Sequence, residues 1–100
     1  MIGGIELGGT KCIAAVAENP TSIIDNVRIS TTNPEQTLSL ISNFFRKYKL
    51  KSLGIATFGP VCLDASSEKY GTILSDTKEG WLGSNVYSTF KQHHAIPMAV

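Results

Sequence analysis

The chain begins with three short apolar runs, at residues 2–7, 11–17 and 22–30, that are separated by turn residues. Runs of this length with β-forming residues favour strands, and strands joined by tight turns pair in antiparallel order. The pattern therefore predicts a three-stranded antiparallel meander in the first part of the chain.

A segment with helical spacing follows the third run. Asn33 is the predicted N-cap, Pro34 takes the first helical position, and Gln36 stands where a capping box has its reciprocal partner. Apolar residues then recur every three or four positions as far as Tyr48. We expect a helix that buries this face in the core and ends near Lys49.

The remaining apolar segments alternate between strand and helix. Residues 53–58 form a compact apolar run, which is typical of a parallel strand in a covered sheet. Helical spacing over residues 85–92 predicts a second helix, and residues 96–100 begin a further strand. The chain is therefore predicted to be an α/β protein with a mixed sheet, in which three antiparallel strands precede a helix-strand-helix-strand order.

Composition and charge limit the functional classes. The 100 residues, 42% of them apolar and 17% charged, suit a single globular domain. A formal net charge of +1 gives no electrostatic reason to expect a nucleic acid or an acidic membrane as a partner. No apolar stretch approaches the roughly 20 residues of a membrane span and no targeting segment is recognisable, so a cytoplasmic protein is predicted.

Metal-binding and disulfide patterns are weak. Cys12 and Cys62 form neither a metal-like cluster nor a disulfide framework, so both are predicted to be reduced thiols. His93 and His94 are adjacent, and adjacent residues of a helix point apart, so we interpret them as polar residues at a helix end.

The stretch from Glu6 to Lys11 carries the candidate chemistry. Gly8 and Gly9 allow positive φ and close backbone approach, while Thr10 offers a hydroxyl donor and Lys11 a positive charge. Successive N–H groups in such a turn can form a nest that binds phosphate oxygens. Glu6 is placed to hold Mg²⁺ through water, because Mg²⁺ prefers oxygen ligands and keeps much of its hydration. A metal-bound nucleotide is the predicted ligand, and an ordinary tight hairpin is the alternative.

Two better-known glycine motifs do not fit this stretch. A Walker A loop ends in Gly-Lys-Ser/Thr and opens a helix, whereas Thr10 and Lys11 stand in the reverse order before β-forming residues. The dinucleotide-binding fingerprint also fails, because no glycine triplet has its spacing and no helix follows. The segment is therefore predicted to be a phosphate-binding hairpin of a different type.

Three segments resemble motifs of one family, in the right order. Residues 5–11 resemble the first phosphate motif, Asp/Glu-x-Gly-Gly-Thr-Lys, of the ROK family (repressors, open reading frames and sugar kinases). Residues 54–61 are similar to its Gly-Ile-x-x-x-Gly-Pro-Val/Ile segment, and residues 70–81 resemble the Tyr-Gly-x-Ile…Lys-x-Gly-Trp segment of the fructokinase branch. Glu6 stands where most of the family has Asp, and the fructokinase branch usually carries Glu there.

The resemblance implies a fold and an activity. It implies that residues 1–100 are the N-terminal lobe of a ribonuclease H-like, actin-like ATPase fold, truncated before the catalytic Asp motif. The complete enzyme would use ATP and Mg²⁺ to phosphorylate a hexose, with fructose to fructose 6-phosphate as the favoured reaction, and would be a homodimer. The catalytic base, the adenine pocket and the family's zinc ligands would all lie outside this chain, so the fragment alone is expected to be inactive.

The resemblance also implies the site residues. The phosphates would contact Gly8, Gly9, Thr10 and Lys11. Glu6 would help to hold the metal. The sugar would be bordered by Gly59, Pro60, Gly80 and Trp81. For Trp81, anchoring of its loop to the core is an equally open interpretation.

Other functions stay open at this point. A non-catalytic sugar-binding or nucleotide-binding module would use the same residues, and a kinase for glucose or mannose would differ mainly in contacts made outside this chain. A ROK repressor is disfavoured, because its winged helix precedes the phosphate motif and Met1 stands just before that motif here.

Overall fold

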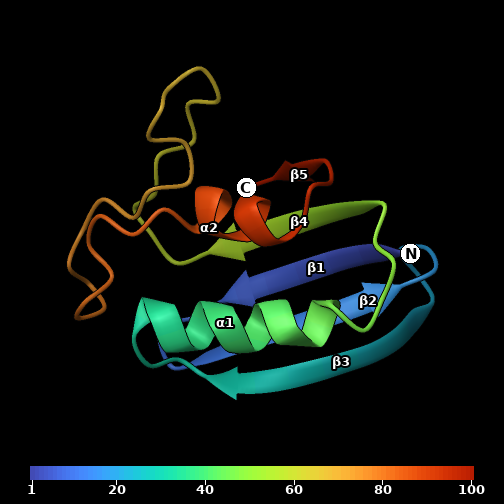
Figure 1. Ribbon diagram of the computed structural model, residues 1–100. Coiled ribbons are helices and arrows are strands. Elements are labelled where there is room, and N and C mark those ends of the chain that lie inside the picture. The colour runs from blue at the N-terminus through green and yellow to red at the C-terminus, as the bar shows by residue number, and fades with distance from the viewer.

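The computed structural model describes residues 1–100 as a five-stranded mixed sheet with two helices (Figure 1). The elements in chain order are β1 (Ile2–Leu7), β2 (Lys11–Ala17), β3 (Ile23–Ser30), α1 (Pro34–Phe45), β4 (Ser52–Thr57), α2 (Val86–His93) and β5 (Met98–Ala99). The α/β class and the order of strands and helices are therefore confirmed.

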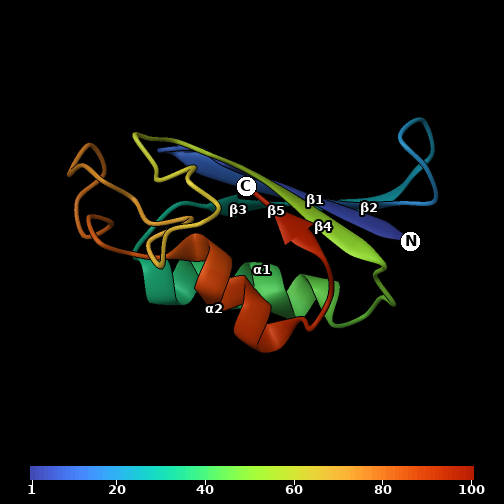
Figure 2. The same ribbon diagram turned by 90° about the horizontal axis from the view of Figure 1, so that it is seen from above.

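The sheet has the strand order β3-β2-β1-β4-β5. β1, β2 and β3 pair in antiparallel order, as the short turns between them favour. β4 pairs in parallel with β1, and β5 pairs in parallel with β4. Each of these two strands follows a helix, which provides the crossover that a parallel pair needs. Seen from above, both helices lie on the same side of the sheet (Figure 2).

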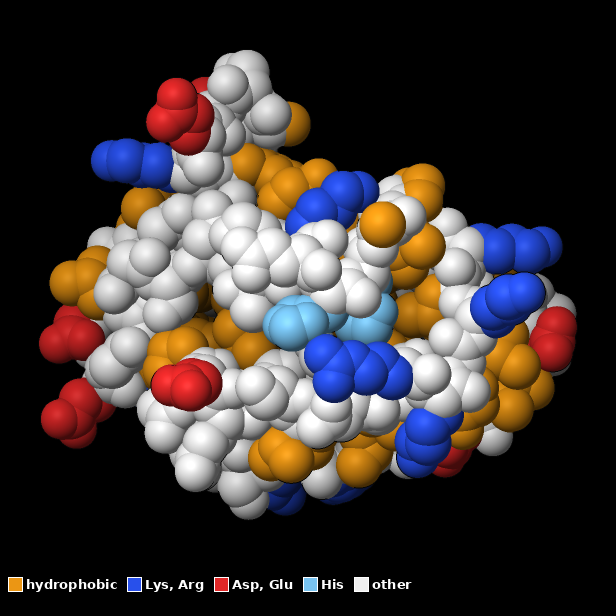
Figure 3. Space-filling model, in the orientation of Figure 1, with side chains coloured by type: hydrophobic (Ala, Val, Ile, Leu, Met, Phe, Trp, Pro, Cys, Tyr) orange, Lys and Arg blue, Asp and Glu red, His pale blue; other side chains and the backbone are white.

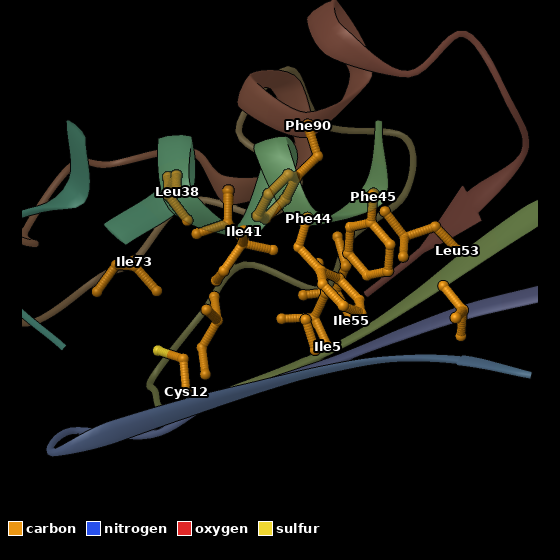
Figure 4. Packing of buried hydrophobic residues seen from close by; sticks show 14 of the residues in the cluster. Ile5, Cys12, Leu38, Ile41, Phe44, Phe45, Leu53, Ile55, Ile73 and Phe90 are labelled. Carbon is orange, nitrogen blue, oxygen red and sulfur yellow. The ribbon is translucent and has the colours of Figure 1, made fainter. Parts of the chain in front are cut away.

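The core lies between the sheet and the two helices (Figure 4). Alternate residues of the central strands point into it, such as Ile5 and Leu7 of β1, whose exposed fractions are 5% and 2%. Phe45 of α1 and Phe90 of α2 belong to the same cluster. The intervening residues of β1 face the opposite side of the sheet, where Glu6 is exposed.

The first turn of α1 uses the predicted cap. The Asn33 side-chain oxygen accepts a hydrogen bond from the Gln36 N–H at 2.8 Å. The reciprocal half of the capping box differs from the prediction, because the Gln36 side-chain oxygen accepts from the Thr32 hydroxyl and the Asn33 side-chain amide, at 3.2 and 3.4 Å, rather than from the Asn33 backbone N–H.

The predicted end of α1 near Lys49 is wrong, because the helix ends at Phe45 with Arg46 as its C-cap. The helical spacing continues to Tyr48 for another reason. The Tyr48 ring packs on Phe44 from the following turn, with ring centroids 5.7 Å apart, and its hydroxyl donates to Asp25. The apolar pattern thus follows the core surface beyond the last helical residue.

The long connection between β4 and α2 folds back on itself. Antiparallel bridges join Val61 to Ile73 and Thr72 to Asn85, which is the N-cap of α2. Ile73 is 1% exposed, so the connection returns to the core before α2 begins.

Candidate functional site

The carboxyl ends of β1 and β4 place two of the predicted segments side by side. The strands pair with Leu7 opposite Thr57, and the Phe58 N–H donates to the Leu7 carbonyl at 2.9 Å. Gly8 and Gly59 follow directly, so their loops start at the same edge of the sheet. Ligands of open α/β sheets bind beyond this kind of edge.

The turn between β1 and β2 exposes the predicted phosphate segment. The Gly8 N–H donates to the Lys11 carbonyl at 3.1 Å, and Gly9, Thr10 and Lys11 are exposed. The N–H groups of Gly9 and Thr10 donate to no backbone carbonyl. Such free N–H groups are the donors that an anion-binding nest uses.

The two glycines of this turn have different surroundings. Neither has a positive φ, so the turn does not use the left-handed conformation that its sequence allows. A Cβ on Gly8 would lie 2.5 Å from the Lys11 carbonyl oxygen, whereas a Cβ on Gly9 would have no heavy atom within 4 Å. The turn itself requires Gly8, while the space around Gly9 is open to a ligand.

Glu6 precedes the turn, on the sheet face opposite the helices. The chain has no group of three His, Cys, Asp or Glu side chains that could enclose a metal ion. Mg²⁺ that arrives with a nucleotide keeps several waters and binds phosphate oxygens, so it needs only one or two protein carboxylates. The single exposed carboxylate of Glu6 fits a water-mediated contact of this kind.

The loop after β4 is attached to the long connection. Gly59 and Pro60 are exposed, and the Leu74 N–H donates to the Pro60 carbonyl at 2.8 Å. The Phe58 ring packs edge to face on Trp81, with ring centroids 5.3 Å apart. The structure therefore brings the segments around Gly59 and Trp81 together.

Trp81 anchors its loop to the core. It is 0% exposed, and its indole N–H donates to the Thr32 carbonyl at 2.8 Å. This burial supports the anchoring interpretation over a direct contact of the indole with a sugar. Gly80 beside it is exposed with a φ of 86°, a conformation that favours glycine, and its contact with a sugar stays a prediction.

The carboxylates with shifted pKa values are held in structural hydrogen bonds. The Ser66 hydroxyl and N–H lower the pKa of Asp64. The Tyr48 hydroxyl lowers the pKa of Asp25, and the same bond raises the pKa of Tyr48. A general base works best when its pKa lies near the operating pH, so neither carboxylate is a good candidate for a catalytic base.

Sequence reasoning does not single out the junction between β3 and α1, yet this junction contacts two of the predicted segments. The Thr31 hydroxyl donates to the Gly8 carbonyl at 2.7 Å, and Thr32 accepts the hydrogen bond from Trp81. The only signal in the sequence is a pair of threonines before the Asn33 cap, and capping alone would explain such residues.

Similarity to known proteins extends over nearly the whole chain. A profile of the ROK family matches residues 2–100. The chain belongs to the ROK family. This ROK chain is 36% identical over 96 residues to a fructokinase of Lactococcus lactis subsp. cremoris, which covers 96% of the chain and 33% of the relative. It is 36% identical over 104 residues to a fructokinase of Zymomonas mobilis, which covers 98% of the chain and 35% of the relative.

The fold is shared with solved ROK structures. A ROK family glucokinase from Streptomyces griseus in complex with glucose and AMPPNP matches with a TM-score of 0.76 and 21% identity, over 99% of this ROK chain and 32% of that protein. This likeness shows the actin-like fold of the ROK sugar kinases. The ROK chain spans about a third of the length of the relatives that it matches. None of its helices has the length and apolar character needed to cross a membrane.

Proposed function

We propose that the full-length ROK protein containing this chain is a hexose kinase that transfers the γ-phosphoryl group of ATP to the primary hydroxyl of fructose. The observation that carries the proposal is the convergence of the Gly8–Lys11 turn and the Gly59-Pro60 loop at the carboxyl ends of β1 and β4. Relatives named fructokinases, and a neighbour bound to glucose and the ATP analogue AMPPNP, support these substrate classes. Residues 1–100 would form its N-terminal lobe.

The Gly8–Lys11 turn between β1 and β2, called the glycine turn below, would bind the phosphates. The free N–H groups of Gly9 and Thr10 and the Thr10 hydroxyl would donate to phosphate oxygens, because they are exposed at the tip of the turn. The Lys11 ammonium would stabilise the charge that shifts between phosphoryl oxygens in the transition state. Phosphoryl transfer depends mainly on positioning and charge stabilisation, which is what these groups supply.

The remaining predicted residues would complete this half of the site. Glu6 would contact nucleotide-bound Mg²⁺ through water, and the ion would neutralise phosphate charge. Gly59, Pro60 and Gly80 would border the hexose, while Trp81 would hold the loop of Gly80 from the core. The group that accepts the proton of the hexose hydroxyl would come from outside residues 1–100. Fructose is favoured because the two relatives that are 36% identical to this chain are both named fructokinases.

Turnover and binding, measured on the full-length protein, test this proposal. ADP release would be followed in a coupled assay with MgATP and fructose, mannose or glucose, and calorimetric titration would measure the binding of each ligand. We expect sugar-dependent ADP release with the highest kcat/KM for fructose. Binding of MgATP and fructose without turnover would support a non-catalytic module instead, and a higher kcat/KM for glucose would overturn the assignment of fructose.

Substitution of Lys11 tests its role in the same assay. Lys11→Ala should lower kcat by about 10²-fold or more, with a smaller change in the KM for ATP, because the ammonium acts mainly on the transition state. Lys47→Ala is the matched control, since Lys47 is an exposed cation that lies over the Phe44 ring at 5.2 Å, next to α1. An unchanged kcat with a raised KM for ATP would show that Lys11 contributes only to binding.

A further inference from the structure

Thr31 forms two hydrogen bonds to carbonyl groups of the glycine turn from the core side. Its backbone N–H donates to the Thr10 carbonyl at 2.9 Å, and its hydroxyl donates to the Gly8 carbonyl at 2.7 Å. The residue is only 7% exposed. The Cys12 sulfur lies 3.2 Å from the same hydroxyl, so the Thr31 side chain is enclosed by neighbours that fix its position.

The hydroxyl takes the place of a bond that a closed turn makes internally. In a β-turn the carbonyl of the first residue commonly accepts from the N–H of the fourth, which would join Gly8 to Lys11. Here the Gly8 carbonyl accepts from Thr31 instead, across 23 residues of sequence. The conformation of the turn therefore depends on a side chain outside the hairpin.

These two bonds set the direction of the N–H groups in the turn. The C=O of one residue and the N–H of the next point in opposite directions in a trans peptide, and the peptides of this turn are trans. The Gly8 carbonyl points toward Thr31, so the Gly9 N–H points away from it. The Thr10 carbonyl also points toward Thr31, which turns the Lys11 N–H away in the same manner.

We infer that Thr31 is a positioning residue for phosphate binding: it holds the glycine turn from the core side so that the Gly9 N–H faces the nucleotide before the nucleotide arrives. The inference rests on the proposed function, because it takes the Gly8–Lys11 turn as the phosphate contact. Donors that are fixed in advance bind and stabilise phosphoryl charge better than donors that must reorganise. Thr31 itself would not touch the substrate.

Thr31→Val in the full-length protein removes the hydroxyl, keeps the backbone bond to Thr10, and preserves the shape of the side chain. We expect kcat/KM for ATP to fall by about tenfold to a hundredfold, because the half-buried Gly8 carbonyl keeps only the weak contact with the Cys12 thiol at 4.0 Å and the turn loses its fixed conformation. The KM for fructose should stay nearly unchanged. Thr31→Ser keeps the hydroxyl and should recover most of the lost kcat/KM.

Thr89→Val is the matched control. The Thr89 hydroxyl also donates to a backbone carbonyl, that of Asn85 at 2.8 Å, but this bond lies at the start of α2 and involves no residue of the glycine turn. Thr89→Val should therefore leave kcat/KM for ATP close to wild type. If Thr31→Val does not give a folded protein, as judged by thermal unfolding, Thr31→Ala provides the same comparison with a smaller side chain.

The outcomes separate this inference from the proposed function. A selective loss for ATP that serine restores would support the positioning role. If Thr31→Val lowers the melting temperature but leaves kcat/KM for ATP and the KM for fructose unchanged, Thr31 is only structural and the positioning role is overturned. A wild-type protein that neither binds MgATP nor phosphorylates any of the hexoses would overturn the proposed function, and the inference with it.

Discussion

Gly8 and Gly9 are neighbours in one turn, but an added side chain would meet different surroundings at each. A methyl group on Gly8 would press on the Lys11 carbonyl, which cannot move without disturbing the pairing of β1 with β2. Gly8→Ala should therefore lower the free energy of unfolding by about 1 to 3 kcal/mol. Gly9→Ala meets no atom and should unfold at nearly the wild-type temperature. Thermal unfolding of the two variants checks this difference.

The same pair distinguishes a binding turn from a plain hairpin. In the full-length protein, Gly9→Ala should weaken MgATP binding, because its Cβ would occupy space that the phosphates need. Calorimetric titration measures this affinity directly. An intact affinity for MgATP in Gly9→Ala would show that the space around Gly9 is not a phosphate site.

At the scale of elements, the sequence predicts what depends on local chemistry. The start of α1 follows from the Asn33 cap and Pro34, because a cap is satisfied by residues that lie within the first turn. The end of α1 does not follow, since the helical spacing up to Tyr48 reflects packing on Phe44 after the helix has ended. The parallel orientation of β4 is predictable because its apolar run follows a helix, whereas its pairing with β1 is not, since β2, β3 and α1 lie between the two strands in the sequence.

Contacts between distant elements explain what the sequence does not predict at the site. Trp81 and Thr32 are 49 residues apart, and Thr31 and Gly8 are 23 residues apart, so no local pattern records these hydrogen bonds. The sequence identifies residue 81 as tryptophan but does not show whether its indole is buried or exposed. Only the packing of the long connection against the junction of β3 and α1 decides between a core anchor and a ligand contact.

The end of α2 links the stability of the fold to pH. His94 is the C-cap, its ring centroid lies 6.1 Å from that of Phe45, and its Nε2 is buried without a hydrogen-bond partner. Burial lowers its pKa from the ordinary value of 6.5, and electrostatic repulsion by His93, when that ring is protonated, and by the Arg46 guanidinium lowers it further. The two histidines lie together beside a basic side chain (Figure 3). The Arg46 guanidinium donates a hydrogen bond to His93 Nδ1 at 3.0 Å.

A group whose pKa is lower in the folded state makes stability depend on pH in one direction. Between the folded pKa and 6.5, the unfolded chain binds more protons than the folded chain, so stability falls as the pH is lowered through this range. We therefore expect a lower melting temperature at about pH 5.5 than at about pH 7.5. The lowered pKa values of Asp25 and Asp64 keep both carboxylates charged across this range.

Two variants assign this pH dependence. His94→Gln should remove most of it, because the group that resists protonation is gone. His93→Gln should retain most of it, since burial is the largest cause of the shift at His94. A melting temperature of the wild-type chain that is the same at both pH values would contradict the assignment.

At the scale of the whole molecule, we expect this chain to supply phosphate donors but no group suited to accept the hexose proton. Asp64 is exposed and its pKa is lowered by Ser66, while Asp25 on β3 accepts a hydrogen bond from the Tyr48 hydroxyl. Glu6 is adjacent to the glycine turn and would lie on the metal side of the γ-phosphorus rather than opposite the leaving group. In-line transfer needs the attacking hydroxyl and its base on that opposite side.

Residues 1–100 alone are therefore expected to show no measurable sugar kinase activity. A positioned base contributes about 10² to 10⁴-fold, and closure of a second lobe over the nucleotide would add the exclusion of water that phosphoryl transfer requires. A coupled ADP-release assay at high protein concentration, with fructose, mannose and glucose, measures this directly, and the full-length protein under the same conditions is the control. Sugar-dependent turnover by the short chain that survives repurification would contradict the prediction. It would place the base among these residues, where the exposed carboxylates of Glu6 and Asp76 would be the first to substitute.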